Sequence, residues 1–173
     1  ILGTIGKSQK IIPSYMDFVD IAGLVKGASQ GEGLGNKFLG HIREVDAIAH
    51  VVRCFNDENI THVSNIIDPL NDIETINTEL QLADIETLET KKNSLEKKSK
   101  QGDKEILNQI SLIEKIIENL NDFNSLLNND FTEEENEFVK SLNIITFKPM
   151  LYICNVDEES VQNGNEMSKK VSD

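Results

Sequence analysis

The sequence predicts an α/β fold in which a parallel β-sheet carries an inserted antiparallel hairpin of two α-helices. Three short apolar runs are typical of buried parallel strands: Met16–Asp20, Ala47–Arg53 and Met150–Asn155. A short amphipathic helix is predicted between the first two runs, at Asn36–Val45, and completes a strand–helix–strand unit. A long helical stretch separates the second run from the third, so the helices interrupt one α/β domain.

The predicted hairpin occupies residues 71–142. Asn71 and Glu74 have the spacing of a capping box at the start of its first helix, and Asp103 can cap the second helix after the Gln101–Asp103 turn. Apolar residues of the second helix recur at alternating steps of four and three, as in a coiled-coil heptad: Ile106, Ile110, Ile113, Ile117, Leu120 and Leu127. We expect an antiparallel coiled coil with arms of roughly 25 residues, about 35–40 Å long. A further short acidic helix follows at Phe131–Leu142, capped by Thr132 and Glu135.

The formal net charge of the 173 residues is −13, which argues against non-specific nucleic-acid binding by the chain as a whole and gives no reason to expect sequence-specific DNA binding. Lysines nevertheless gather around the predicted hairpin turn: Lys91, Lys92, Lys97, Lys98, Lys100 and Lys104. Two interpretations stay open for this cluster, a solvated helix surface or a docking site for an RNA-rich partner. No run is long and apolar enough to span a membrane. Cys54 and Cys154 are predicted to be reduced core thiols of a cytosolic protein.

The first predicted strand ends in Asp20, and Gly23 follows three residues later. This spacing lets a nucleotide hydrolase place a carboxylate near Mg²⁺ and a backbone N–H at the terminal phosphate. Leu24 occupies the position at which many GTPases carry a water-orienting Gln, and an apolar side chain cannot orient water. The glycines that follow favour a loop that rearranges easily, either a phosphate-sensing switch or an ordinary flexible loop: Gly27, Gly31, Gly33 and Gly35.

The third predicted strand ends at Asn155, at the edge where parallel sheets bind ligands. GTPases commonly carry Asn-Lys-x-Asp there, whereas this chain has Val156 and Glu158 at the second and fourth positions. Glu is one methylene longer than Asp, so we expect a guanine preference to weaken by ~1–3 kcal/mol. His62 lies in the loop after the second strand, where it is either incidental or able to position water.

One glycine-rich segment near the start of the chain is not a phosphate loop. Gly3 and Gly6 are separated by two residues, whereas the phosphate-binding loop needs four so that its N–H groups can surround a phosphate.

The longest of these motifs together resemble one known family. The stretch Met16–Ser29, its continuation Gly31–Leu39 and the segment Asp68–Leu70 closely resemble the YchF / Obg-like ATPases, which are P-loop NTPases of the translation-factor class. Gly102–Lys104 at the hairpin turn and Lys148–Pro149 before the last strand are similar too.

The resemblance implies a P-loop NTPase-type sheet with a coiled-coil insertion, ATP hydrolysis with GTP as a poorer ligand, and association with ribosomes in the cytoplasm. It implies that His62 is catalytic, that Asp20 holds Mg²⁺ through water and that Gly23 senses the γ-phosphate. Asn155 and the Val156 backbone correspond to the adenine site, which extends to Glu158. The lysine cluster is then a candidate contact with the ribosome or one of its subunits.

The resemblance also implies a longer protein, because the family has a phosphate loop before the region of Met16 and a TGS domain at its C-terminus. We therefore expect an internal part of such a protein: residues 1–70 and 143–173 belong to the nucleotide-binding domain and residues 71–142 to the insertion. This part should bind nucleotide poorly by itself, because the phosphate loop supplies most of the contacts. Two alternatives stay open, a GTPase of the Obg class and a non-catalytic coiled-coil docking module.

Overall fold

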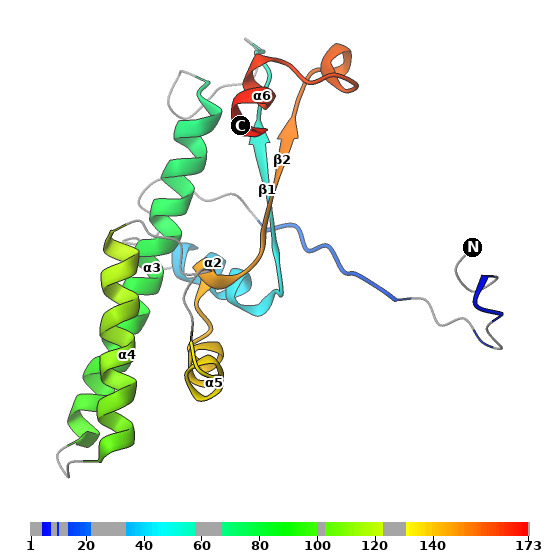
Figure 1. Cartoon of the computed structure of the whole chain (residues 1–173). Helices are drawn as coiled ribbons and strands as arrows, with labels where there is room; N and C mark the ends of the chain where they lie inside the picture. Colours follow the sequence, from blue (N-terminus) through cyan, green and yellow to red (C-terminus); the bar gives the residue numbers. More distant parts are fainter. Residues whose placement is uncertain are drawn as a thin grey trace.

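Two parallel strands form the sheet, and helices pack against one of its faces (Figure 1). The computed structural model describes residues 5–7, 10, 14–21, 34–57, 67–99, 103–122 and 131–172. Strand β1 is Ile48–Arg53 and strand β2 is Met150–Asn155. They pair in register from Ile48 opposite Met150 to Arg53 opposite Asn155, although about a hundred residues separate them in the sequence. Both strands were predicted, and the structure confirms them to within one residue.

The predicted strand at Met16–Asp20 is wrong for the described structure. Residues 14–20 are exposed, form no strand, and run away from the sheet (Figure 1). Met16 and Phe18 are 78% and 82% exposed. The apolar pattern alone could not make a strand, because a strand also needs a neighbour that pairs with its N–H and C=O groups. The described sheet contains only the β1–β2 pair.

Helix α2, Leu34–Glu44, confirms the predicted short helix before β1. Its apolar residues Leu39 and Ile42 are buried against α3 and the segment that leads into β2. Their partners in this small core are Leu80, Ala83 and Ile145. The cluster attaches α2 to two parts of the chain that are distant in sequence.

Helices α3, Pro69–Lys98, and α4, Lys104–Asn121, lie side by side and run antiparallel (Figure 1). The arms have 30 and 18 residues, instead of the equal arms that the sequence predicted. Asp68 caps α3, and its side chain accepts a hydrogen bond from Asn71 N, so the prediction of Asn71 as the cap is wrong. Pro69 explains the difference, because proline fits the first helical position and the chain can enter the helix earlier. Asp103 caps α4 as predicted.

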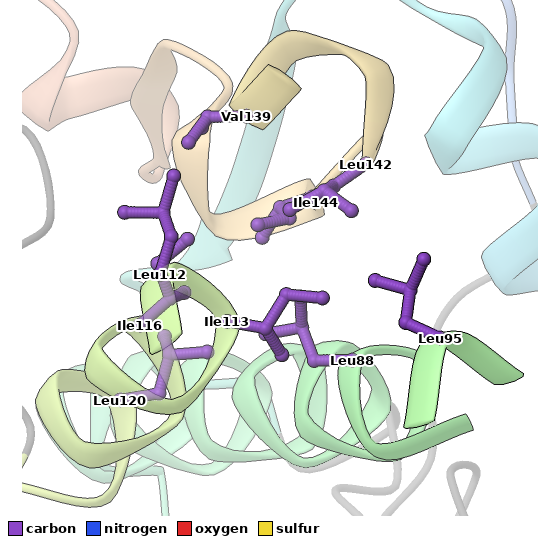
Figure 2. Close-up of a cluster of buried hydrophobic side chains, with 9 residues drawn as sticks. All are labelled: Leu88, Leu95, Leu112, Ile113, Ile116, Leu120, Val139, Leu142 and Ile144. Atoms are coloured by element: carbon purple, nitrogen blue, oxygen red, sulfur yellow. The ribbon is translucent and has the colours of Figure 1, made fainter. Parts of the chain in front are cut away.

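The core between these helices also includes residues of α5 and of the turn after it (Figure 2). Ile113 and Leu120 of the predicted heptad are buried, whereas Ile106, Ile110 and Ile117 are only partly buried. Leu112 and Ile116, which lie off the heptad, are buried as well. The apolar stripe of α4 is therefore wider than a two-helix seam, because the helix packs against α3 on one side and against α5 on the other. Leu127 lies outside the described residues.

Helix α5, Glu133–Ser141, begins with the predicted capping box of Thr132 and Glu135. Asn143 follows with φ 51°, the left-handed conformation that commonly ends a helix. The 3₁₀ turn η3, Ile145–Phe147, then leads into β2. After β2 come the 3₁₀ turn η4, Glu158–Ser160, and helix α6, Glu166–Ser172, where the sequence predicted only a polar segment.

The two faces of the sheet differ in burial. Val52 lies at 2% exposure on the face toward α3, whereas Val51, Leu151 and Ile153 on the other face are 61%, 63% and 42% exposed. Among the described helices, none combines the length and apolar character needed to cross a membrane.

Candidate functional site

The predicted base-recognition motif lies where the two strands end together. Arg53 pairs with Asn155 at the last register position, and Cys54 N donates to Asn155 O at 2.7 Å just beyond it. Asn155 and Glu158 are exposed, and Val156 is half-buried. The ladder bond holds the Asn155 main chain, so its side chain stands at the carboxyl edge of the parallel sheet, where ligands bind in such folds.

Asp157 organises the turn that follows. Its carboxylate accepts a hydrogen bond from Ser160 N at 2.9 Å and closes η4. Hydrogen bonding from the Ser160 side chain, supported by backbone N–H groups, lowers the pKa of Asp157. Both acidic side chains are exposed, but the Asp157 carboxylate is engaged in the turn, whereas no contact of that kind holds Glu158 among the described residues.

The exit of β1 is held by Arg53. Its Nε donates to Phe55 O at 3.2 Å, its Nη2 donates to Asp57 O at 3.1 Å, and its guanidinium lies 4.8 Å from the centre of the Phe55 ring. These contacts hold residues 55–57 against the end of β1, and residues 58–66 that follow lie outside the described part of the chain. His62 belongs to that segment and lies outside the described residues.

Asn165 is a residue of this edge that the sequence analysis missed. Its Nδ2 donates to Cys54 O at 2.6 Å, and its Oδ1 accepts from Ser168 N at 2.9 Å. One side chain therefore caps α6 and ties it to the exit of β1. The spacing of Asn165 and Ser168 is a helix-capping signal that could have revealed α6, although not the contact with Cys54.

The predicted switch residues lie mostly outside the described part of the chain. Asp20 is exposed in the extended segment, and Ile21 next to it packs against the core of α2 and α3. Gly35 lies in the first turn of α2. Outside the described residues are Gly23, Leu24, Gly27, Gly31 and Gly33.

Neither of two surface cavities in the described part of the chain is lined by Asp20 or Asn155. One, of about 270 Å³, lies between α2 and α3 and is lined in part by Arg43 and Thr87. The other, of about 370 Å³, lies between α3 and α4 beside Lys92 and Glu114. The predicted nucleotide site therefore corresponds to an open sheet edge in the described structure rather than to either cavity.

The described residues contain no group of three or more His, Cys, Asp or Glu side chains that could hold a metal ion. Mg²⁺ in nucleotide hydrolases usually needs only one or two carboxylates, because substrate phosphates and water complete its shell. A single exposed Asp20 carboxylate fits that donor set.

Cys54 and Cys154 are both free thiols. Cys54 is fully buried, whereas Cys154 is half-buried. Burial, with a smaller contribution from the neighbouring Cys154, raises the pKa of the Cys54 thiol to about 11. A thiol that is buried and protonated is a poor nucleophile, so Cys54 has the properties of a packing residue.

His50 lies in the middle of β1 and is half-buried. Burial lowers its pKa from the ordinary value of 6.5, although the charge of Asp72 acts in the opposite direction. Its ring lies 5.6 Å from the ring of Tyr152, whose hydroxyl shares a hydrogen bond with Asn77. Tyr152 therefore joins the sheet to α3 and His50 packs beside it, whereas His41 is exposed on α2.

The lysine cluster is not uniform. Lys92 Nζ lies 2.6 Å from a Glu114 carboxylate oxygen and 3.9 Å from Glu96, so it is part of an ion-pair network between the arms. The hydrogen bond to Glu114 is the main reason that its pKa is raised. The exposed members are Lys91, Lys97, Lys98 and Lys104, and Lys100 lies outside the described residues.

The chain is similar in sequence to proteins named ribosome-binding ATPase YchF. It is 51% identical to the one from Haemophilus influenzae over 163 residues, which cover 94% of this chain and 45% of the relative. It is 50% identical to the one from Bacillus subtilis over 165 residues, with the same coverage of 94% and 45%. The chain thus spans less than half the length of these curated relatives.

A sequence profile described as "50S ribosome-binding GTPase" matches residues 4–78. Among solved structures, one described as "Structure of the Schizosaccharomyces pombe YchF GTPase" is similar, with a TM-score of 0.78 and 34% identity. That similarity covers 99% of this chain and 47% of the yeast chain. The fold neighbour therefore extends over both the sheet and the helices.

Proposed function

This chain belongs to the YchF family of ribosome-binding ATPases, and we propose that it carries the switch region, base-recognition edge and helical hairpin of an ATP-hydrolysing protein that acts at the ribosome in the cytoplasm. The main structural support is the position of Asn155, whose main chain is fixed by Cys54 N at the carboxyl edge of a parallel sheet. An exposed amide beside a half-buried Val156 is suited to a flat, uncharged base.

Each predicted site residue has a distinct part in the proposed reaction. The Asn155 side chain and the Val156 main chain hold adenine, and the Gly23 N–H contacts the terminal phosphate. His62 orients the attacking water, since Leu24 cannot. Asp20 would hold Mg²⁺ through water, and the ion neutralises phosphate charge when it is bound.

The base-site proposal is tested with Asn155→Ala in the full-length protein that carries this sequence. Loss of one hydrogen-bonding side chain should weaken ATP binding about tenfold, ~1.4 kcal/mol. Titration calorimetry measures the change, and Glu159→Gln, an exposed neighbour in η4, is the matched control. Unchanged ATP affinity in Asn155→Ala would exclude this edge as the base site.

The role of His62 is tested separately from binding. His62→Ala should slow ATP hydrolysis by about 10²-fold or more, the usual contribution of a positioned general acid–base group, with ATP affinity nearly unchanged. A variant that hydrolyses ATP at the parent rate would remove His62 from the mechanism, whereas a parent protein without ATP hydrolysis would favour the docking-module alternative.

A GTPase is the second candidate, because the matching profile and the yeast structure are both described as GTPases. Competition between ATP and GTP for the full-length protein distinguishes the two. We expect ATP to bind more tightly, since Glu158 is longer than the Asp that normally holds guanine. Preferential GTP binding would overturn the assignment of ATP.

We also propose that the tip of the hairpin contacts ribosomal RNA through its exposed lysines. Lys97 and Lys98 lie in the last turn of α3, and Lys169 and Lys170 lie in the last turn of α6, so the two pairs are matched in sequence and helix position. Lys97→Glu/Lys98→Glu should weaken co-sedimentation with ribosomes and make it less dependent on salt, whereas Lys169→Glu/Lys170→Glu should not. If the two double variants weaken co-sedimentation equally, the lysines of the tip contribute only general surface charge and make no specific contact with the ribosome.

A further inference from the structure

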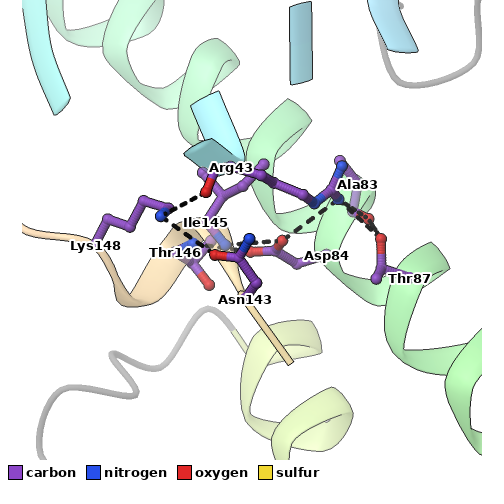
Figure 3. Close-up of polar contacts among 8 residues, drawn as sticks. All are labelled: Arg43, Ala83, Asp84, Thr87, Asn143, Ile145, Thr146 and Lys148. Carbon is purple, nitrogen blue, oxygen red and sulfur yellow. Dashed lines mark hydrogen bonds and ion pairs between the residues drawn. The ribbon is translucent and has the colours of Figure 1, made fainter. Parts of the chain in front are cut away.

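Four polar side chains meet where α2, α3 and the segment before β2 converge (Figure 3). We call Arg43, Asp84, Thr87 and Lys148 the polar joint. Asp84 is 1% exposed, although it lies on a helix whose other acidic residues are mostly exposed. Asp84 is thus the buried member of the joint, whereas Arg43 and Lys148 are half-buried and Thr87 is exposed.

Arg43 connects α2 to α3. Its Nη2 donates to Thr87 Oγ1 at 2.8 Å and to Ala83 O at 3.2 Å, and the same nitrogen lies 3.8 Å from an Asp84 carboxylate oxygen. The Thr87 hydroxyl itself donates to Ala83 O at 2.9 Å, which orients it toward Arg43. The guanidinium therefore contacts three residues within one turn of α3, namely Ala83, Asp84 and Thr87.

Asp84 and Lys148 connect these helices to the segment before β2. Asp84 accepts hydrogen bonds from Ile145 N at 3.0 Å and Thr146 N at 2.8 Å. Lys148 Nζ donates to Arg43 O at 3.0 Å and Val45 O at 2.6 Å, the carbonyls that α2 leaves open at its end. The joint thus closes a ring from α2 to α3, then to the entry of β2, and back to α2.

We propose that the polar joint couples the nucleotide site to the helical hairpin, a proposal that rests on the switch function proposed above. Helix α2 follows the predicted switch loop directly, and α3 is an arm of the hairpin. A change in the loop that shifts α2 therefore turns α3 with it. Thr87 and Lys98 are eleven residues apart, roughly 16 Å along α3, so a rotation of the helix at Thr87 also displaces the tip.

The joint also has unused hydrogen-bonding capacity. Arg43 Nε is buried and has no hydrogen-bond partner among the described residues. An unpaired buried donor is costly, so an arrangement of α2 that paired it would gain a hydrogen bond.

The test measures the position of the hairpin tip in the full-length protein that carries this sequence. Spin labels are introduced through non-natural amino acids at Lys97, near the tip, and at Val161, which is 69% exposed beyond β2. We expect the distance between the labels to differ by several ångströms between complexes with ADP and with a non-hydrolysable ATP analogue. Arg43→Lys/Thr87→Val should reduce that difference to less than half while nucleotide affinity stays within twofold.

Thr78→Val is the matched control. Thr78 Oγ1 donates to Glu74 O at 2.8 Å, so it makes the same bond within α3 as Thr87, about 13 Å away along the helix. This variant should keep the full nucleotide-dependent change. The proposal is overturned if the tip does not move between the two nucleotide complexes, or if Arg43→Lys/Thr87→Val retains the whole change. Failure of the parent protein to bind nucleotide is a different result, which would reject the proposed function and this coupling with it.

Discussion

Asp84 is a carboxylate that stabilises a turn distant in sequence. Burial raises its pKa above the ordinary value of 3.8, while the N–H groups of Ile145 and Thr146 and the charge of Arg43 act against that rise. Asp84→Ala would leave both N–H groups without an acceptor. We predict a loss of about 2–4 kcal/mol in the free energy of unfolding, measured by urea titration. Glu86→Ala, an exposed change on the same helix, should cost less than about 0.5 kcal/mol, and equal losses would contradict the role of Asp84.

His50 makes the stability of the chain depend on pH. Its folded-state pKa is lowered below 6.5 by burial, so the folded state binds fewer protons than the unfolded state in the window below 6.5. Its contribution to stability is complete above 6.5 and is lost as the pH falls through the folded-state value. We predict that thermal unfolding measured from about pH 7 down to pH 5 shows a smaller loss of stability in His50→Gln than in the parent. Parallel curves for the two proteins would show that His50 is not the group responsible.

At the scale of helices and strands, a hydrophobic core shared by α3, α4 and α5 stabilises the hairpin. Ile113 is fully buried among residues of α3 and α5, whereas Leu107 on the same helix is 49% exposed. Ile113→Ala should lower the free energy of unfolding by about 2–5 kcal/mol, because it removes buried methyl groups and leaves a cavity. Leu107→Ala is the control and should have little effect. A small loss for Ile113→Ala would mean that the core is packed loosely enough to collapse around the change.

A helix that is too short to be stable by itself depends on capping contacts. Helix α6 has seven residues, fewer than an isolated helix needs in water. Asn165 compensates, since it caps the helix and also donates to Cys54 O. The position of α6 therefore depends on the end of β1, which the local sequence of α6 does not reveal.

At the scale of the whole molecule, one face of the two-stranded sheet is open. Val51, Leu151 and Ile153 together place exposed apolar side chains on that face. We predict that the 173-residue chain, expressed alone, self-associates through it, which light scattering coupled to gel filtration measures. Leu151→Lys should reduce the association, whereas Val161→Lys, an equally exposed residue beyond β2, should not. A monomeric parent chain at high concentration would contradict this prediction.

Much of the architecture could be predicted from local patterns. The two β-strands, α2 and the capping of α4 and α5 follow from apolar periodicity and short capping motifs, whose physics involves neighbours within four residues. The prediction at Met16–Asp20 failed because strand formation depends on a pairing partner that local composition does not specify. The site residues of the base edge remain predictions, although Asn155 lies at the sheet edge where the sequence placed it.

The sequence by itself determined the types of β1, β2 and helices α2 to α5, the position of the base-recognition motif at the end of β2 and the family resemblance, since all of these are encoded in contiguous residues. Only the tertiary structure decided that Asp84 is buried, that Arg43 donates hydrogen bonds to α3 and that Asn165 donates a hydrogen bond to Cys54 O after β1. These contacts join residues that lie 40 to 111 positions apart. A polar residue on a helix is expected to face solvent until another segment covers it, and which segment does so is settled only when the chain folds.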